Sequence, residues 1–421
     1  MTSYPATREA GLARLRDFVG RAGEEYASRR NNVPGTVSGL SPYIRHRLVS
    51  EEEVAREVLA RHSYAAAEKF LQEVCWRTYW KGWLEMRPEV WFRYLNDLHV
   101  LHSRMAVEPD FTESVQRAEE GKTGLDCFDD WSRELRETGY LHNHVRMWFA
   151  SIWIHTLRLP WQLGADFFMR HLLDGDPASN TLSWRWVCGL QTKGKVYQAT
   201  AKNIERFTEG RYAPHGLLAS EATPAPEDFV ITPPAELTRP NESILGEKSI
   251  LLVTEEDLTP ESWGISPSDL AGIVLVDTTA VFPGIGPRPI SWKRQALEEA
   301  SMRLKAVFPC PVLLQSAQVD AASKDLQARL SSLPKGYRAH SFTIMNPPVG
   351  PVCSLINPVL IGLQKEGHVV RRLRRSWDEV FWPHSTHGFF KMKERIPELL
   401  KQLSPNQGAT REDRDPSFHP K

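Results

Sequence analysis

Residues 174–186 read DGDPASNTLSWRW and carry more information than any other part of this chain. Two carboxylates, one amide and two indoles occur within thirteen consecutive residues. Carboxylates and an amide can hold the polar edge of a flat heteroaromatic cofactor, and indoles can exchange single electrons with it. The stretch therefore indicates a redox site that holds a flavin.

The composition is that of an ordinary globular protein. The 421 residues are enough for two or three domains, and 41% of them are hydrophobic and 25% charged. Lys plus Arg and Asp plus Glu both number 52. Binding to nucleic acid would therefore depend on a local basic patch, because the chain has no net charge to attract it.

The cysteines and the N-terminus indicate the compartment. No CxxC pair occurs, which favours free thiols in a reducing compartment over disulfides or a zinc site, at Cys75, Cys127, Cys188, Cys310 and Cys353. The first fifteen residues lack a signal-peptide pattern, and no apolar run approaches the ~20 residues of a membrane span. We expect a cytoplasmic protein with no membrane partner.

The first half of the chain has a helical pattern. Apolar residues recur at spacings of three and four in 52–59, 65–84 and 145–157, so residues 1–212 are predicted to form an all-α domain. Ten of the fourteen tryptophans lie in it. Residues 213–246 are rich in Pro and Ala and predict an extended linker.

Beyond the linker, β-branched runs alternate with helical segments. Strands are predicted at 249–254, 272–277, 311–315 and around Phe342, and helices at 292–307, 320–330 and 352–365. This alternation favours a parallel, Rossmann-like sheet with helices on both faces over residues 247–403. Residues 404–421 are polar and predict a disordered tail.

The helical half resembles the FAD-binding domain of the photolyase and cryptochrome family. Six blocks occur in the family's order: ARLRDF with EEYASRR, SGLSPYIRHRLVS, FLQEVCWRTYW, GKTGLDCFDDWSRELRETGYLHNHVRMWFAS, LPWQLGADFF and LLDGDPASNTLSWRW. The resemblance implies an all-α FAD-binding domain. It leaves a second, antenna chromophore unidentified.

SGLSPY, residues 38–43, places hydroxyls and a glycine before a helical pattern that begins near Val49. Such groups at a helix N-terminus can cradle phosphate, although a simple helix cap is the other interpretation. The resemblance implies a diphosphate-binding loop, with Tyr26 as a further phosphate contact, at Ser38, Gly39, Leu40 and Ser41. Val37 stands where the family has threonine, and Thr36 is the neighbouring donor that could replace it.

The resemblance also assigns residues to the flavin ring. Arg146 and Asp174 correspond to an ion pair beside the isoalloxazine, and Asp176 to a contact with the flavin or its ribityl chain. A guanidinium there would stabilise a reduced, anionic flavin. Asn180 corresponds to the residue that faces N5, and an amide at this place favours a repair-type flavin over that of plant cryptochromes.

Trp184 and Trp161 match the first two members of the family's electron-transfer chain. Helical tryptophans are more often core residues, because they bury a large apolar area. The third tryptophan has no counterpart in 106–116, where it is expected. Electron transfer could instead end on Trp131 or Trp153.

The lesion-binding side of the cyclobutane-dimer photolyases is also matched. The corresponding residues are Glu73, Trp76, Asn143, His144, Met147 and Trp186, with Arg30 as a further contact. Indoles offer flat walls for flipped bases. His144 departs from the family's arginine and offers fewer donors and no permanent charge.

Four other stretches have alternative interpretations. The histidines of LHNH, 141–144, diverge on a helix, so we predict no metal site there. PGIGPRP, 283–289, is a Pro-rich loop and not a dinucleotide fingerprint. RRLRR, 371–375, predicts a solvated strand edge that could also touch nucleic acid. HGFFKMKERIPELL, 387–400, resembles the segment that leads out of the family's antenna domain, which would then be permuted to the C-terminus.

These residues together predict a carbon–carbon lyase, a photolyase that repairs cyclobutane pyrimidine dimers in damaged DNA under blue light. An electron would pass from excited reduced FAD to a flipped lesion and return after the ring splits. The main alternative is a cryptochrome-like photoreceptor that binds FAD and signals to a protein partner. A flavin-binding interaction module is a third alternative.

Overall fold

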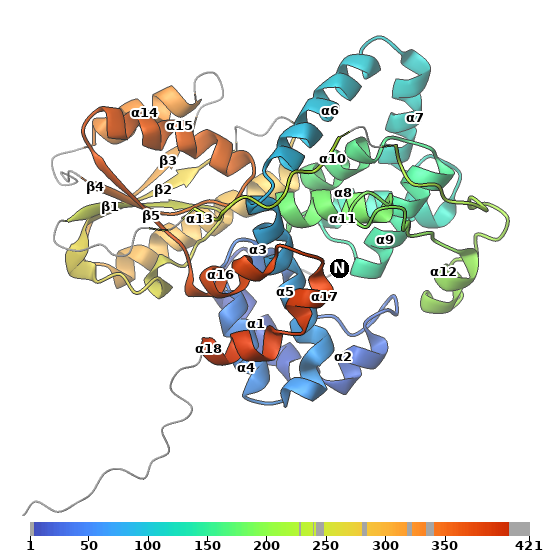
Figure 1. Cartoon of the computed structure of the whole chain (residues 1–421), viewed down its shortest axis with the longest axis horizontal. Helices are drawn as coiled ribbons and strands as arrows, with labels where there is room; N and C mark the ends of the chain where they lie inside the picture. Colours follow the sequence, from blue (N-terminus) through green and yellow to red (C-terminus); the bar gives the residue numbers. More distant parts are fainter. Residues whose placement is uncertain are drawn as a thin grey trace, which may run out of the picture.

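The computed structural model describes residues 4–226, 229–238, 240, 248–279, 284–317, 322–333 and 341–403. Figure 1 shows a sheet flanked by helices next to a larger assembly of helices. Among the described helices, none is long and apolar enough to cross a lipid bilayer. Both predicted classes of structure are therefore present, the first in the N-terminal half and the second in the C-terminal half.

The helical part begins with twelve α-helices and one π-helical turn. They are α1 Arg8–Val19, α2 Glu24–Arg29, α3 Ser41–Arg45, α4 Glu51–Leu59, α5 Tyr64–Glu85, α6 Glu89–Met105, α7 Pro109–Glu120, α8 Asp126–Thr138, α9 Asn143–Ser151, η1 Ile152–Thr156, α10 Trp161–His171, α11 Pro177–Val187 and α12 Ala201–Phe207. Local sequence sets several starts: the hydroxyls of Ser50 and Ser63 cap α4 and α5, and the Asp176 carboxylate caps α11.

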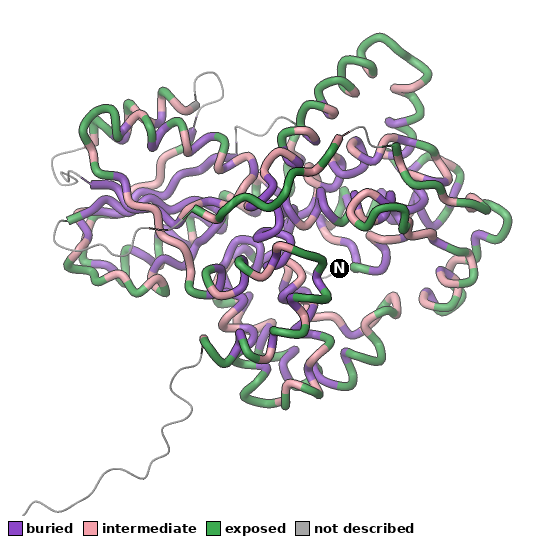
Figure 2. The backbone as a smooth tube through the Cα atoms, in the orientation of Figure 1, coloured by how far each residue is buried: buried purple, intermediate pink, exposed green. Residues whose placement is uncertain are grey.

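The second part is a five-stranded parallel sheet in the order β3-β2-β1-β4-β5. Its strands and helices are β1 Ser249–Thr254, β2 Leu270–Asp277, α13 Pro287–Val307, β3 Val312–Ser316, α14 Ala322–Ser331, β4 Ser341–Met345, α15 Pro351–Lys365 and β5 Val369–Leu373. Figure 2 shows the three inner strands as buried. The order reverses between β1 and β4, which is the doubly wound arrangement.

Alternate residues of the inner strands enter two different cores. Those of one parity pack with α13, and those of the other parity pack with α14 and α15, which lie on opposite faces in Figure 1. This confirms the predicted parallel sheet with helices on both faces. The basic cluster 371–375 overlaps the edge strand β5, as predicted, but Arg375 is nearly buried and pairs with Asp257 at 2.5 Å.

The last helices pack on the helical part and not on the sheet. α16 Ser376–Phe381, the turn η7 Trp382–His384, α17 Phe389–Lys393 and α18 Ile396–Gln402 lie around α5. Trp377 Nε1 donates to Thr78 Oγ1 at 2.8 Å, and the Tyr79 hydroxyl donates to the His387 carbonyl at 2.9 Å. The limits 1–212 and 247–403 remain predictions, and we propose that residues 376–403 belong with the helical part.

The segment predicted as a linker has no helix or strand among its described residues 213–226, 229–238 and 240. It follows the helical part, where Ala235 N–H donates to the Met86 carbonyl at 2.9 Å and Thr232 donates to Glu89 at 2.7 Å. The rest of the segment, Pro283 and the predicted tail 404–421 lie outside the described residues. The loop predicted at 283–289 is wrong for its last three residues, because α13 begins at Pro287, a position in the first helical turn that tolerates proline.

Arg45 and His46 join the helical part to the loop after β1. The Arg45 guanidinium donates two hydrogen bonds of 2.6 Å to the Glu256 carboxylate. His46 Nδ1 lies 2.6 Å from the Glu255 carbonyl oxygen. Burial and the neighbouring Arg45 lower the pKa of His46 far below its ordinary value, so the imidazole is neutral.

Arg47 extends the same junction to the C-terminal helices. Its guanidinium donates to Asp378 at 2.7 and 2.8 Å, and it lies 3.2 Å from Glu51 and 3.4 Å from Asp257. All four side chains are buried. One buried cation therefore contacts three carboxylates from three distant parts of the chain, and Arg375 also pairs with Asp257.

Candidate functional site

One cavity of about 860 Å³ lies in the helical part, among α2, α5, α9 and α11. Except for Trp161, every residue that we predicted for the site lines it. These residues are Tyr26, Arg30, Ser38, Gly39, Leu40, Ser41, Glu73, Trp76, Asn143, His144, Arg146, Met147, Asp174, Asp176, Asn180, Trp184 and Trp186. The fold thus brings the proposed cofactor side and the proposed lesion side into one space.

Arg146 and Asp174 form the predicted ion pair, with Nη2 2.9 Å from Oδ2. Arg146 Nε also donates to the Leu141 carbonyl at 2.9 Å, which orients the guanidinium. Burial alone would raise the pKa of Asp174, but Arg146 outweighs burial and holds this pKa below its ordinary value. Asp174 Oδ1 is buried and has no hydrogen-bond partner among the described residues, so a ligand can use it.

Asp176 is held by a cluster of cations that the sequence did not predict. Its Oδ2 lies 3.4 Å from Lys81 Nζ and 3.7 Å from both Arg45 Nε and Arg77 Nη1. Burial would raise the pKa of Asp176, but the three cations outweigh it and lower this pKa. Its Oδ1 accepts the Ser179 N–H at 2.8 Å. Asp176 therefore positions α11 as well as facing the cavity.

A sequence signal for two of these cations was present. Arg77 and Lys81 follow Glu73 by four and eight residues on α5. Residues at this spacing share one face of a helix, so a cavity-facing Glu73 implies that Arg77 and Lys81 lie along the same side. Arg45 gave no such signal, because its partners are distant in the sequence.

The predicted phosphate loop runs along the cavity at the start of α3. Helix α3 begins at Ser41, so the hydroxyl lies at a helix start earlier in the chain than the expected position near Val49. Gly39 has a φ of 61°, and a Cβ at this position would lie 2.8 Å from Arg14 Nη1. The loop conformation therefore requires glycine at this place.

The neighbouring positions lack the family's threonine hydroxyl. Val37 lines the cavity, whereas Thr36 does not. The Thr36 hydroxyl donates to Glu25 at 2.9 Å. The suggestion that Thr36 replaces the missing donor is therefore wrong, because its proton is already used elsewhere.

Asn180 and Trp184 lie on the cavity side of α11. Asn180 Nδ2 donates to the Ala165 carbonyl at 2.8 Å, which sets the orientation of its amide. The Trp184 ring packs edge-on against Phe168, with a centroid distance of 5.1 Å, and against α10 at Gly164. Trp184 is buried from solvent but faces the cavity.

Gly164→Ala is expected to lower the free energy of unfolding by about 1–3 kcal/mol. The added Cβ would lie 2.3 Å from Trp184 Cη2, so the indole would have to move. Thermal unfolding would measure the change. Gly20→Ala is the control, since nothing lies within 4 Å of its Cβ position and its φ is −61°. Equal losses in both variants would mean that the contact with Trp184 is not the cause.

Another part of the cavity wall, which we call the aromatic wall, carries rings from two distant segments. Trp76 on α5 stacks on Phe389 of α17, with centroids 3.7 Å apart and an interplanar angle of 16°. Phe390 also lines the cavity and is 74% exposed. Trp186 stacks on Tyr197 at 5.5 Å. The sequence predicted only Trp76 and Trp186 for this wall. The C-terminal helix α17 adds Phe389 and Phe390 to it.

The charged groups on this wall are paired. Arg30 Nη1 lies 2.5 Å from Glu73 Oε1, and both side chains are about one-third exposed. His144 Nδ1 lies 2.8 Å from the Asn31 carbonyl oxygen, and its ring stacks on Trp148 at 4.1 Å. Burial lowers the pKa of His144, so this residue is neutral where the family has a charged arginine.

Trp161 lies outside the cavity at the start of α10. Its ring stacks on Tyr94 of α6, with centroids 5.7 Å apart and an interplanar angle of 24°. It precedes Gly164 by one helical turn, and Trp184 packs on Gly164. That Trp184 and Trp161 are successive members of a relay remains a prediction.

The cavity fits a flavin nucleotide in its polar groups. Four buried polar atoms of the residues that line it have no hydrogen-bond partner among the described residues, namely Asp174 Oδ1, Asp176 Oδ2, Ser179 Oγ and Arg77 Nη1. Buried polar groups are rarely left unpaired in native proteins, so these atoms are suited to a polar ligand. Arg146 and Arg77 add positive charge for a diphosphate or a reduced ring.

The family comparison agrees with this geometry. The sequence model described as "FAD binding domain of DNA photolyase" matches residues 70–215. The deoxyribodipyrimidine photo-lyase of Synechococcus sp. is 30% identical over 51% of this chain and 48% of its own length. That of a Thermus thermophilus strain is 34% identical over 48% of this chain and 49% of its own. The chain thus spans about half the length of these relatives.

Two similar solved structures are a class III photolyase and a cryptochrome. The photolyase is from Agrobacterium tumefaciens, with 27% identity, a TM-score of 0.41 and coverage of 48% of this chain and 42% of the other. The cryptochrome is from Synechocystis sp. PCC6803, with 23% identity, a TM-score of 0.41 and coverage of 49% and 44%. By the family model, residues 70–215 are similar to the FAD-binding domain of DNA photolyases.

Proposed function

We propose that this protein is a cytoplasmic, FAD-dependent enzyme that uses blue light to repair cyclobutane pyrimidine dimers in damaged DNA. The observation that carries the proposal is that Arg146, Asp174 and Asn180 line the same cavity as Trp76 and Trp186. A flavin and a flipped dimer would then be in contact with each other. The photo-lyase relatives support the same reaction.

The chain's own residues would bind and orient the lesion. The indoles of Trp76 and Trp186 offer faces on which flipped bases stack, at ~1–3 kcal/mol per base. Phe389 holds Trp76 in place by stacking behind it. Glu73 and Arg30 direct polar groups at the edges of the bases or at the neighbouring phosphates.

Arg146 and Asp174 would act on the cofactor side. When bound and reduced, FAD supplies the electron that splits the dimer. The Arg146 guanidinium stabilises negative charge near the ring, and Asp174 keeps that guanidinium in place. Water is largely excluded there, because Asp174 and Asn180 are buried.

Loss of dimers from irradiated DNA under blue light would test the proposal directly. The protein is reduced chemically before illumination, so the result does not depend on how the flavin is reduced. We expect dimers to disappear in the light and to persist in the dark. Persistence of the dimers in the light with fully reduced flavin would contradict the proposal.

Glu73→Gln is expected to reduce the repair rate by about tenfold or more, since hydrogen bonds to charged groups contribute about 1.5–3 kcal/mol. FAD content is expected to stay unchanged, because Glu73 pairs with Arg30 and is not part of the Arg146–Asp174 ion pair. Glu68→Gln on the same helix is the control, since among the described residues Glu68 forms ion pairs only with Lys69 and Lys393, and it does not line the cavity. Equal repair rates in the two variants would remove Glu73 from the lesion site.

The neutral, buried His144 favours a second candidate function, a blue-light photoreceptor that signals to a protein partner. Without a permanent charge, this position attracts the DNA backbone less than arginine would. Such a protein is expected to bind dimer-containing and undamaged DNA equally. A clear preference for dimer-containing DNA would favour repair.

A further inference from the structure

We propose that Tyr94 and Trp91 continue the electron relay that Trp184 and Trp161 begin, in place of the tryptophan missing from residues 106–116. The inference rests on the proposed flavin photochemistry, but it concerns how the cofactor becomes reduced and not how a lesion is repaired. Its geometry comes from α10 and α6, which pack against each other.

The first link joins Trp184 to α10. Trp184 lines the flavin cavity, and its ring presses against Gly164, where a Cβ would be 2.3 Å from Cη2. Trp161 lies three residues earlier on the same helix and therefore on the same face. Trp184 and Trp161 therefore both lie beside the first turns of α10.

The next two links lie on α6. Tyr94 stacks on Trp161, with centroids 5.7 Å apart, and Trp91 lies 5.3 Å from Tyr94. Trp91 and Tyr94 are each 2% exposed, so the surrounding protein holds both rings in place. Trp161, Tyr94 and Trp91 thus form a row of neighbouring rings between α10 and α6. Trp184 packs on α10 next to the start of this row.

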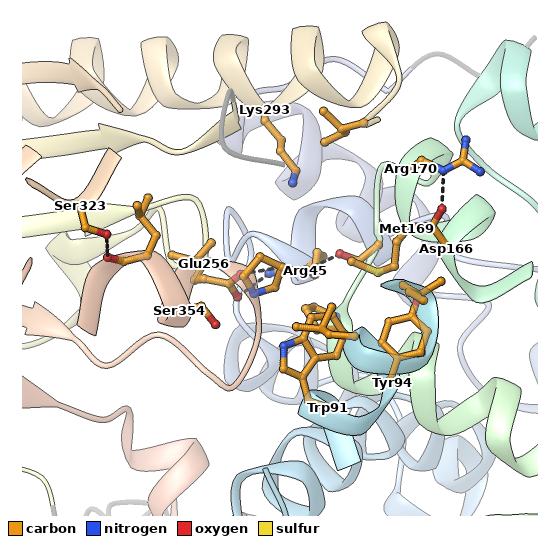
Figure 3. Close-up of a pocket in the computed structure, with 18 of the residues that line it drawn as sticks. Arg45, Trp91, Tyr94, Asp166, Met169, Arg170, Glu256, Lys293, Ser323 and Ser354 are labelled. Carbon is orange, nitrogen blue, oxygen red and sulfur yellow. Dashed lines mark hydrogen bonds and ion pairs between the residues drawn. The ribbon is translucent and has the colours of Figure 1, made fainter. Parts of the chain in front are cut away.

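The row ends at a second cavity of about 750 Å³ between the helical part and the sheet. Figure 3 shows Trp91 and Tyr94 at its lower side, Arg45 and Glu256 near the middle of the view and Lys293 above. Trp91 Nε1 is buried and has no hydrogen-bond partner among the described residues. Because Trp91 lines this cavity, a small molecule inside it would lie next to the last ring.

Charge would rest on Trp91 and not on Tyr94. The Tyr94 hydroxyl also has no hydrogen-bond partner among the described residues. Burial raises the pKa of Tyr94 far above its ordinary value, so this phenol has no route for losing a proton when it is oxidised. An indole keeps positive charge on its ring more readily than a phenol does, so Tyr94 passes the charge on.

Each step of the relay moves one electron. One electron leaves Trp184 for the photoexcited oxidised flavin, and Trp161, Tyr94 and Trp91 each give one electron to the ring before them. One positive charge then remains, on Trp91. A small thiol is the reductant that returns this electron, and two thiols oxidised in this way combine to a disulfide with loss of two protons.

Neither alternative end leads from Trp184 to a further oxidisable ring. Trp153 lies 6.3 Å from Trp184, but its other ring neighbours are Phe128, Phe149 and Phe167, which are not oxidised under these conditions. Trp131 has Trp148 and Tyr212 as its ring neighbours, at 5.6 and 5.7 Å. Among the described ring pairs, none joins Trp131, Trp148 or Tyr212 to Trp184 or Trp161.

Transient absorption of the FAD-loaded protein after a blue flash tests the relay. In the wild type we expect a long-lived tryptophanyl radical cation that a small thiol, dithiothreitol, removes. Trp91→Phe is expected to abolish this long-lived signal, and Tyr94→Phe to reduce it strongly. Trp153→Phe and Tyr212→Phe are expected to leave it unchanged. An unchanged signal in Tyr94→Phe, or its loss in Tyr212→Phe or Trp153→Phe, would overturn the proposal.

Two features keep the test decisive. Tyr94→Phe retains the ring and removes only a hydroxyl without a partner, so its fold and FAD content are expected to be unchanged even if Trp91→Phe loses the cofactor. Dimer repair by chemically reduced protein is expected to be the same in wild type and Tyr94→Phe. Failure of repair in both would contradict the proposed function and leave the relay to be decided by the radical signal.

Discussion

Arg47→Ala is expected to lower the free energy of unfolding by about 3–5 kcal/mol, the range for removing one partner from a buried ion pair. In the variant, Asp378, Glu51 and Asp257 would stay buried but would lose their ion pairs with Arg47. These carboxylates come from the C-terminal helices, α4 and the loop after β1. The whole junction would therefore weaken, and denaturant unfolding monitored by tryptophan fluorescence would measure the loss.

Arg16→Ala is the matched control for this experiment. Arg16 pairs with Glu9 at 2.6 Å, but both side chains are more than half exposed, so we expect a change of at most ~1 kcal/mol. Comparable losses in the two variants would show that Arg47 contributes no more than a surface arginine. Limited proteolysis of Arg47→Ala is expected to release the α/β part earlier than in wild type, because the two parts are joined there.

Arg146→Met is expected to weaken FAD binding by about 10- to 100-fold, since a hydrogen bond to a charged group contributes about 1.5–3 kcal/mol. Methionine keeps much of the apolar stem and removes the guanidinium that faces the cavity and pairs with Asp174. Without this cation, burial would raise the pKa of Asp174, and the site would lose both charges. Titration of the apoprotein with FAD would measure the affinity.

Two further variants separate charge from geometry at this place. Arg146→Lys keeps the positive charge but not the fork that bonds Asp174 and the Leu141 carbonyl together, so an intermediate affinity is expected. Arg136→Met removes an exposed arginine of α8 and is expected to bind FAD like wild type. Wild-type affinity in Arg146→Met would exclude Arg146 from the flavin site.

Local sequence patterns predicted the elements that carry the site. The period of three to four residues is a property of one helix, so 65–84 could be assigned to a helix that the structure has as α5, Tyr64–Glu85. Alternation of β-branched runs with helices likewise predicted the parallel sheet. The resemblance then selected residues from 26 to 186, and the cavity contains all of them except Trp161.

The sequence by itself therefore determined the helical and α/β classes of structure and most residues of the cavity, because spacing and motif order are local properties. Only the tertiary structure decided which distant segments meet. Phe389 stacks on Trp76, Tyr94 stacks on Trp161, and Arg47 binds Asp378 across 331 positions. Such contacts depend on how whole helices pack against one another, and an amphipathic helix such as α16 could bury its apolar face on either part. No pattern within a few residues carries that choice.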